Sequence, residues 1–191
     1  MTHTINTVSL SLNIARRFGL DERTQEDIYL GALLHDVGKI AIPMSILESP
    51  GKLSDDEMTI MRTHVAETEA LIKDIVPDNI CQIAVRHHEK LDGSGYPHGL
   101  KADQLSFPQR IVAVADIVSA LSNRRSYKEP FPEEKTVAVL RGMAGRLLDV
   151  PICQYVSDNY AAIMESTEPE RAAVIAQYRS IMEEYDQLQK K

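Results

Sequence analysis

Seven side chains in the sequence could together bind metal ions. Imidazole and carboxylate groups suit iron, manganese and zinc in proteins. Only six histidines occur in the chain, and five of them fall at motif-like positions, while two aspartates lie within or beside apolar segments. The candidate ligands are His3, His35, Asp36, His64, His87, His88 and Asp116. Each has a plainer interpretation on its own, and spacing alone does not prove that the seven meet.

The two aspartates are the hardest to explain without a partner, because burying an unpaired carboxylate is costly. Asp36 follows the apolar end of a predicted helix in GALLHDVGKIAIP, and Asp116 lies in the middle of RIVAVADIVSAL. The second segment is apolar nearly all round, which indicates a buried helix. The alternatives are a solvent-facing helix end for His35 and Asp36, and an ion pair or hydrogen bond for Asp116. His64 could equally be a surface histidine or a hydrogen-bonded one.

The stretch HHEKLDGSGYP combines adjacent histidines with a turn. Neighbouring helical residues point about 100° apart, so His87 and His88 can serve one site only near a helix end or in a cluster of metals. Gly93 and Gly95 allow a backbone to approach a ligand closely, and Tyr96 could stack on a nucleotide base. The plainer alternative is a surface turn with a packed tyrosine.

Composition narrows the class of protein. The chain has 191 residues, is 43% hydrophobic and 26% charged, and carries a net charge of −7. This charge argues against binding a nucleic-acid polymer. No apolar run approaches the length of a membrane span, and no signal peptide is evident. The two cysteines lie far apart, so we expect a cytoplasmic protein with free thiols.

Helical periodicity dominates the chain, and strand-like alternation is scarce. We therefore predict an all-α protein. The Ser54–Glu57 pair is a capping-box signal, and Pro132 can open the helix after it. The expected helices span residues 4–18, 25–37, 55–74, 78–90, 107–122, 132–145 and 151–165.

The last segment, 168–189, carries a heptad-like stripe of apolar side chains. We predict a main domain over residues 1–166 and a C-terminal helix within 167–191. This helix either packs on its own domain or forms a homodimer contact, and two heptads are too few to decide.

Two long motifs, LLHDVGKIAIP and HHEKLDGSGYPHGL, resemble those of the HD-GYP family of bacterial phosphodiesterases, from His3 to about Asp149. The resemblance implies an HD-type bundle of about seven to eight helices with a metal centre in its core. It also implies two or three metal ions, usually iron or manganese. The substrate that it implies is cyclic di-GMP.

The resemblance also assigns roles to metal ligands. His3, His35, Asp36 and Asp116 match the ligands of one metal. Asp36 matches a bridge to a second metal, which is held also by His64, His87 and His88.

Other motif positions match residues that meet the substrate. Lys39 matches a lysine that contacts the scissile phosphate, and Tyr96 a tyrosine near a guanine. Arg125 and Lys128, in SNRRSYK, match a basic pair that holds phosphate. The signature loop is completed by Asp92, Gly93 and Gly95.

Some positions depart from the family pattern. Three-metal members carry a glutamate four residues before the first histidine, a position that would precede Met1. We therefore expect two metal ions, and an upstream sensor or receiver domain outside this chain. Thr68 replaces a usual glycine, Ser119 and Ser126 replace a common aspartate and proline, and LLDVP replaces Phe-Asp-Pro.

The sequence thus predicts a binuclear phosphodiesterase that cleaves cyclic di-GMP to pGpG through a metal-bridging hydroxide. A second cut to GMP follows if the linear product rebinds. The alternatives are a cyclic di-GMP receptor or interaction module with little turnover, and a phosphohydrolase for another nucleotide.

Overall fold

The structure is a computed structural model that describes residues 2–122, 130–169, 172 and 176. Helices make up most of this part of the chain, and no β-strand occurs in it, which confirms the all-α prediction. The helices are α1 (Thr2–Arg17), α2 (Glu22–Leu34), α3 (Met44–Leu47), α4 (Asp55–Arg62), α5 (His64–Ile72), α6 (Asp78–Val85), α7 (Phe107–Ser122), α8 (Glu133–Met143) and α9 (Val150–Asp158), with short 3-10 helices η1 (Val37–Ala41) and η2 (Ala102–Gln104).

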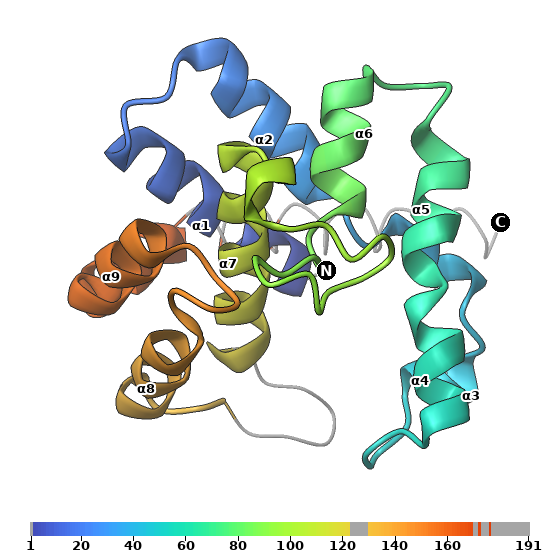
Figure 1. The fold of residues 1–191 in the computed structure, drawn as a ribbon. Helices are drawn as coiled ribbons and strands as arrows, with labels where there is room; N and C mark the ends of the chain where they lie inside the picture. Colours follow the sequence, from blue (N-terminus) through green and yellow to red (C-terminus); the bar gives the residue numbers. More distant parts are fainter. Residues whose placement is uncertain (1, 123–129, 170–171, 173–175, 177–191) are drawn as a thin grey trace, which may run out of the picture.

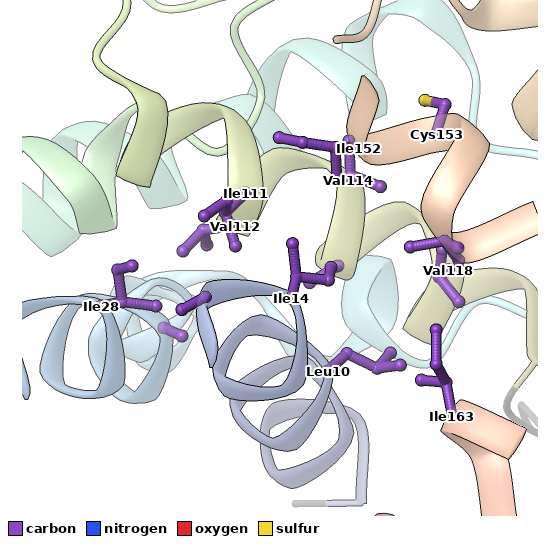
Figure 2. Packing of buried hydrophobic residues seen from close by; sticks show 14 of the residues in the cluster. Leu10, Ile14, Ile28, Ile111, Val112, Val114, Val118, Ile152, Cys153 and Ile163 are labelled. Atoms are coloured by element: carbon purple, nitrogen blue, oxygen red, sulfur yellow. The ribbon is translucent and has the colours of Figure 1, made fainter. Parts of the chain in front are cut away.

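The apolar helix α7 lies in the middle of the molecule (Figure 1), with α8 and α9 to one side of it and α4 to α6 to the other. Its side chains Ile111, Val112, Val114 and Val118 are fully buried. They pack with residues of α1, α2 and α9 (Figure 2), which include Leu10, Ile14, Ile28 and Ile152. The expectation of a buried helix around Asp116 is therefore confirmed.

A second, smaller core joins α5 to α6. Val65 and Ile72 of α5 pack with Cys81, Ala84 and Val85 of α6. Gly31 lets α2 approach the same region, because a Cβ at this position would lie 2.4 Å from Cγ2 of Ile83. These contacts fix the ends of α2, α5 and α6 relative to one another.

Three predicted helices are wrong in their extent, and all three errors concern candidate ligands. The predicted helix 55–74 is divided at Thr63 into α4 and α5, so His64 begins a new helix. The predicted helix 78–90 ends at Val85, so His87 and His88 lie in the turn after it. The predicted helix 25–37 starts at Glu22 and ends at Leu34, which leaves His35 and Asp36 between α2 and η1.

Other helix signals were interpreted correctly. Ser54 and Glu57 form both hydrogen bonds of a capping box, and Pro132 is the N-cap of α8. The predicted helix 151–165 is also wrong in its extent, because α9 ends at Asp158 and a separate helical run covers residues 160–169, where the hydroxyl of Thr167 donates to the carbonyl of Met164. Most of segment 168–189 lies outside the described residues, so its packing and any dimer contact stay predictions. Among the described helices, none has the length and apolar character needed to cross a membrane.

Candidate metal centre

Three of the predicted ligands share one local arrangement. In His35, His64 and His87, Nδ1 lies 2.6 Å from the carbonyl oxygen of the residue three positions earlier. A carbonyl oxygen can only accept a hydrogen bond, so Nδ1 must carry the proton in each ring. In the neutral imidazole this leaves Nε2 with a free lone pair.

The three Nε2 atoms are buried and have no hydrogen-bond partner among the described residues. They converge on the carboxylate of Asp36, at 3.3 Å from His35, 3.5 Å from His64 and 3.9 Å from His87. Lone pairs and a carboxylate that face one another in a buried space repel, unless a cation lies among them. This donor set fits a divalent metal ion of the transition series.

A second carboxylate, that of Asp116, completes the cluster from the middle of α7. Its Oδ1 lies 3.0 Å from Nε2 of His3 and 3.8 Å from Nε2 of His35, and its Oδ2 lies 3.8 Å from Nδ1 of His88. The structure therefore brings all seven predicted ligands together from five parts of the chain. They form overlapping groups with ligand-like spacing, namely His64, His87 and His88, then His3, His35 and Asp116, then His35, Asp36 and His87.

Both carboxylates are ionised despite their burial. Burial alone would raise the pKa of Asp36, but the neighbouring His35 ring and the charge of Lys39 outweigh it and hold this pKa well below its usual range. The pKa of Asp116 is likewise held low, because the close contact with His3 and the neighbouring histidines outweigh burial. The cluster therefore offers two anionic ligands near neutral pH.

Most imidazoles in the cluster are held in the neutral form that binds metals. Burial lowers the pKa of His64, lowers that of His87 well below its usual value, and lowers that of His88 to about 3. His35 is the exception: burial opposes its protonation, but the nearby negative charges of Asp36 and Asp116 raise its pKa overall. A metal ion binding here would therefore displace few protons from the other three rings.

Lys39 lies at the open edge of the cluster. Its Nζ is 2.5 Å from Oδ2 of Asp36, and its side chain is 33% exposed, whereas that of His35 is fully buried. The ammonium group thus stands between the ligands and solvent, where an incoming anion could meet it.

The GYP loop, residues 92–97, folds back against residues 88–90 as a compact turn. Gly95 has no room for a side chain, because a Cβ there would lie 2.4 Å from the amide nitrogen of Lys90. Gly93 adopts a positive φ of 82°. Asp92 accepts hydrogen bonds from the amide and hydroxyl of Ser94 at its exposed edge. Asp92 therefore shapes the turn, while Tyr96 faces the cluster, with its ring centroid 4.6 Å from that of His88.

Sequence reasoning missed three residues that border the site. The buried carboxylate of Glu89 accepts hydrogen bonds from the amides of His98 and Leu100, so it holds the GYP loop in place. The guanidinium of Arg62 lies 5.1 Å from the ring centroid of Tyr96. Thr68 accepts from the amide of Gly38 and donates to the carbonyl of His35. Glu89 left a signal, as an acid directly after two candidate ligands, and Thr68 left one as a departure from the family pattern, whereas Arg62 left none. The predicted substrate residues Arg125 and Lys128 lie outside the described residues.

The chain is similar in sequence to known phosphodiesterases. The cyclic di-GMP phosphodiesterase response regulator RpfG of Xanthomonas campestris is 44% identical over 143 residues, which is 73% of this chain and 38% of the relative. The 3'3'-cGAMP-specific phosphodiesterase 1 of Vibrio cholerae is 34% identical over 140 residues, again 73% of this chain and 32% of the relative. The chain thus spans about a third of the length of these relatives.

A solved structure shows the same fold. Bd1817, a HDG"Y"P protein from Bdellovibrio bacteriovorus, superposes with a TM-score of 0.70 at 21% identity, over 83% of this chain and 51% of that one. The model of the HD domain family matches residues 2–152, which include every candidate metal ligand. The chain therefore belongs to the HD domain family, and within it to the HD-GYP type that its two long motifs predicted.

Proposed function

We propose that this chain is a binuclear metal-dependent phosphodiesterase that hydrolyses cyclic di-GMP to pGpG, and to GMP where the linear product rebinds. The observation that carries the proposal is the set of three buried, unpartnered Nε2 atoms that face the Asp36 carboxylate. Such an arrangement is costly in a protein that binds no cation, and it is what a metal-dependent hydrolase needs.

Two divalent ions, iron or manganese, fit the ligand groups. One would be held by His64, His87 and His88, and the other by His3, His35 and Asp116. Asp36 would serve both, since its Oδ2 faces His3 and His35 while its Oδ1 faces His64 and His87. When bound, such a metal pair activates water at neutral pH and neutralises charge on a phosphoryl group.

The other residues would bind and orient the substrate. Lys39 would place its ammonium against the phosphate that is cleaved and stabilise the charge that develops there. Tyr96 would contact a guanine, although His88 and Arg62 already lie against its ring, so the base would meet an edge of the ring or displace Arg62. Asp92, Gly93 and Gly95 would keep the loop in shape.

Arg125 and Lys128 would bind the phosphates and offset the net charge of −7. The names of the relatives support a cyclic dinucleotide that contains guanine, because one is a cyclic di-GMP phosphodiesterase and another is specific for 3'3'-cGAMP. Cyclic di-GMP is proposed rather than 3'3'-cGAMP because RpfG, the more similar of these two relatives, is named a cyclic di-GMP phosphodiesterase.

The deciding experiment uses protein purified without oxygen and supplied with Mn²⁺ or Fe²⁺. Cyclic di-GMP and 3'3'-cGAMP are incubated separately, and the products are separated by chromatography. We expect metal-dependent formation of pGpG from cyclic di-GMP, at a rate above that for 3'3'-cGAMP. Bound metal and bound cyclic di-GMP without product would instead support the receptor function.

A matched pair of variants completes the experiment. Asp36→Ala removes the carboxylate that faces four of the candidate histidines and should abolish both metal content and turnover. Asp103→Ala removes an exposed carboxylate and should leave both unchanged. Full metal content in Asp36→Ala would contradict the bridging role.

Several wider features belong to the same proposal. They are a main domain over 1–166 followed by a C-terminal helix, a homodimer contact through that helix, and an upstream sensor or receiver domain. A cytoplasmic location is proposed because both cysteines, Cys81 and Cys153, are free thiols, which persist in reducing compartments.

A further inference from the structure

Ser119 connects the central helix to the first candidate ligand. It is fully buried on α7, one helical turn after Asp116. Its hydroxyl oxygen lies 2.8 Å from Nδ1 of His3 and 2.9 Å from the carbonyl oxygen of the same residue. Both contacts cross between helices, from α7 to the beginning of α1.

The two contacts determine where the protons lie. The His3 carbonyl can only accept, so the Ser119 hydroxyl must donate its single proton to it. The hydroxyl oxygen can then only accept from the ring, which places a proton on Nδ1 of His3. In the neutral ring Nε2 is left as the lone-pair atom, and it is this atom that lies 3.0 Å from Oδ1 of Asp116.

His3 obtains its orientation differently from the other ligands. His35, His64 and His87 each bond to a backbone carbonyl three residues earlier, which no side-chain substitution removes. His3 depends on a side chain from another helix. Its orientation can therefore be tested by one substitution that leaves the backbone and the ligands in place.

We infer that Ser119 is a positioning residue for His3, which it holds as an Nε2 metal ligand in the group with His35 and Asp116. The inference rests on the metal centre of the proposed function. Residues that hold the second nitrogen of a ligand histidine typically change metal affinity by about 10-fold to 100-fold when they are replaced. Ser119 touches neither His64, His87 nor His88 in any contact described above, so its effect should be confined to one metal position.

The first test needs no substitution. In protein labelled with ¹⁵N-histidine and loaded with diamagnetic Zn²⁺, the NMR shifts of the two ring nitrogens report which of them binds the metal and which carries the proton. We expect the His3 ring to carry its proton on Nδ1. A ring with its proton on Nε2, or an even mixture of the two tautomers, would overturn the inference.

The second test measures Mn²⁺ binding, with free Mn²⁺ followed by electron paramagnetic resonance. Wild type should bind two ions. Ser119→Ala should bind one of them about 10-fold or more weakly and the other unchanged, and its His3 ring should lose the fixed tautomer. Ser122→Ala is the matched control, because this serine lies on the same helix and its hydroxyl donates to the carbonyl of Val118. Circular dichroism establishes that both variants are folded.

The outcomes separate this inference from the function on which it rests. Wild-type affinities in Ser119→Ala, or equal weakening of both ions, would overturn the positioning role and leave the proposed phosphodiesterase standing. A wild-type protein that takes up no Mn²⁺ would remove the metal centre itself, and the inference with it.

Discussion

Three of the candidate histidines are oriented by carbonyl groups that the ends of helices leave without partners. The last carbonyls of an α-helix have no amide of their own helix to bond. Ala32 lies in the last turn of α2 and Ala84 in the last turn of α6, and each carbonyl accepts from the Nδ1 of a histidine just beyond the helix. One hydrogen bond thus satisfies the helix end and selects the ring nitrogen that faces the cluster.

At this same scale, Lys39 can be separated from the ligands. Lys39→Met keeps the length and packing of the side chain but removes the charge that lies against Asp36. Because Lys39 is no ligand, metal content should stay at the wild-type level. Loss of a charge placed at the reacting phosphate should lower kcat by about 100-fold. Turnover with cyclic di-GMP and metal analysis of the same samples measure both quantities.

Lys52→Met provides the control, because Lys52 is exposed in the loop before α4. It should keep full activity. If Lys39→Met lost its metal ions together with its activity, Lys39 would be required for assembly of the cluster rather than for the reaction.

At the scale of helices, the sequence predicted the type of each element better than its ends. Asp116 in a helix that is apolar all round was enough to predict a buried position on α7, because that conclusion depends only on local pattern. The division at Thr63 could not be predicted, because residues on both sides of it form helix readily. The break brings His64 to the start of α5, where the helix meets η1, and such a contact between distant segments leaves no local signal.

The same reason explains which residues of the site were missed. Arg62 reaches Tyr96 across a separation of more than thirty residues, and Thr68 reaches Gly38 over a similar one. Only the fold shows these pairs. Motif residues such as His87 and His88 could be found because unusual residue types stand next to one another in the chain.

The contact between η1 and α5 supplies a prediction at this scale. A Cβ on Gly38 would lie 2.1 Å from the carbonyl oxygen of His64 and 2.4 Å from the amide nitrogen of Thr68. Gly38→Ala must therefore push apart the two segments that carry His35, Asp36 and His64. We expect it to destabilise the protein by about 1–3 kcal/mol and to weaken metal binding. Urea unfolding and Mn²⁺ titration measure the two effects.

Gly51→Ala is the matched control. A Cβ on Gly51 meets no atom within 4 Å, and its backbone does not require a positive φ. This variant should keep wild-type stability and metal affinity. If Gly38→Ala behaved in the same way, the close approach of η1 to α5 would not position the ligands.

On the scale of the whole molecule, the candidate site draws on segments from the beginning of α1 to the middle of α7. Its ligands therefore meet only when the helical body has folded. A metal ion that binds the folded chain stabilises all of it, by an amount that grows with the concentration of free ion. Without metal, the buried imidazoles should instead make stability depend on pH.

The direction of that dependence follows from the pKa shifts of the histidines. Burial lowers the pKa of His64, His87 and His88 below the usual 6.5, so as the pH falls below 6.5 the unfolded chain takes up protons that the folded chain refuses. Their stabilising effect is present above pH 6.5 and is lost in acid. His35 opposes this trend, because its raised pKa favours the folded state at lower pH.

We expect the three histidines with a lowered pKa to outweigh His35, whose pKa is raised. The carboxylates of Asp36 and Asp116 stay ionised at pH 5, because their pKa values are held low. For His88, whose pKa is lowered to about 3, the loss on going to pH 5 is about 2 kcal/mol. Metal-free protein, prepared with a chelator, should therefore unfold at lower urea concentrations at pH 5 than at pH 7.5.

His88→Gln should make this dependence of stability on pH shallower, whereas His98→Gln, at an exposed position outside the cluster, should leave it unchanged. A metal-free protein that became more stable on acidification would mean that its histidines are protonated in the folded state, and such a cluster could not hold metal ions at neutral pH as proposed.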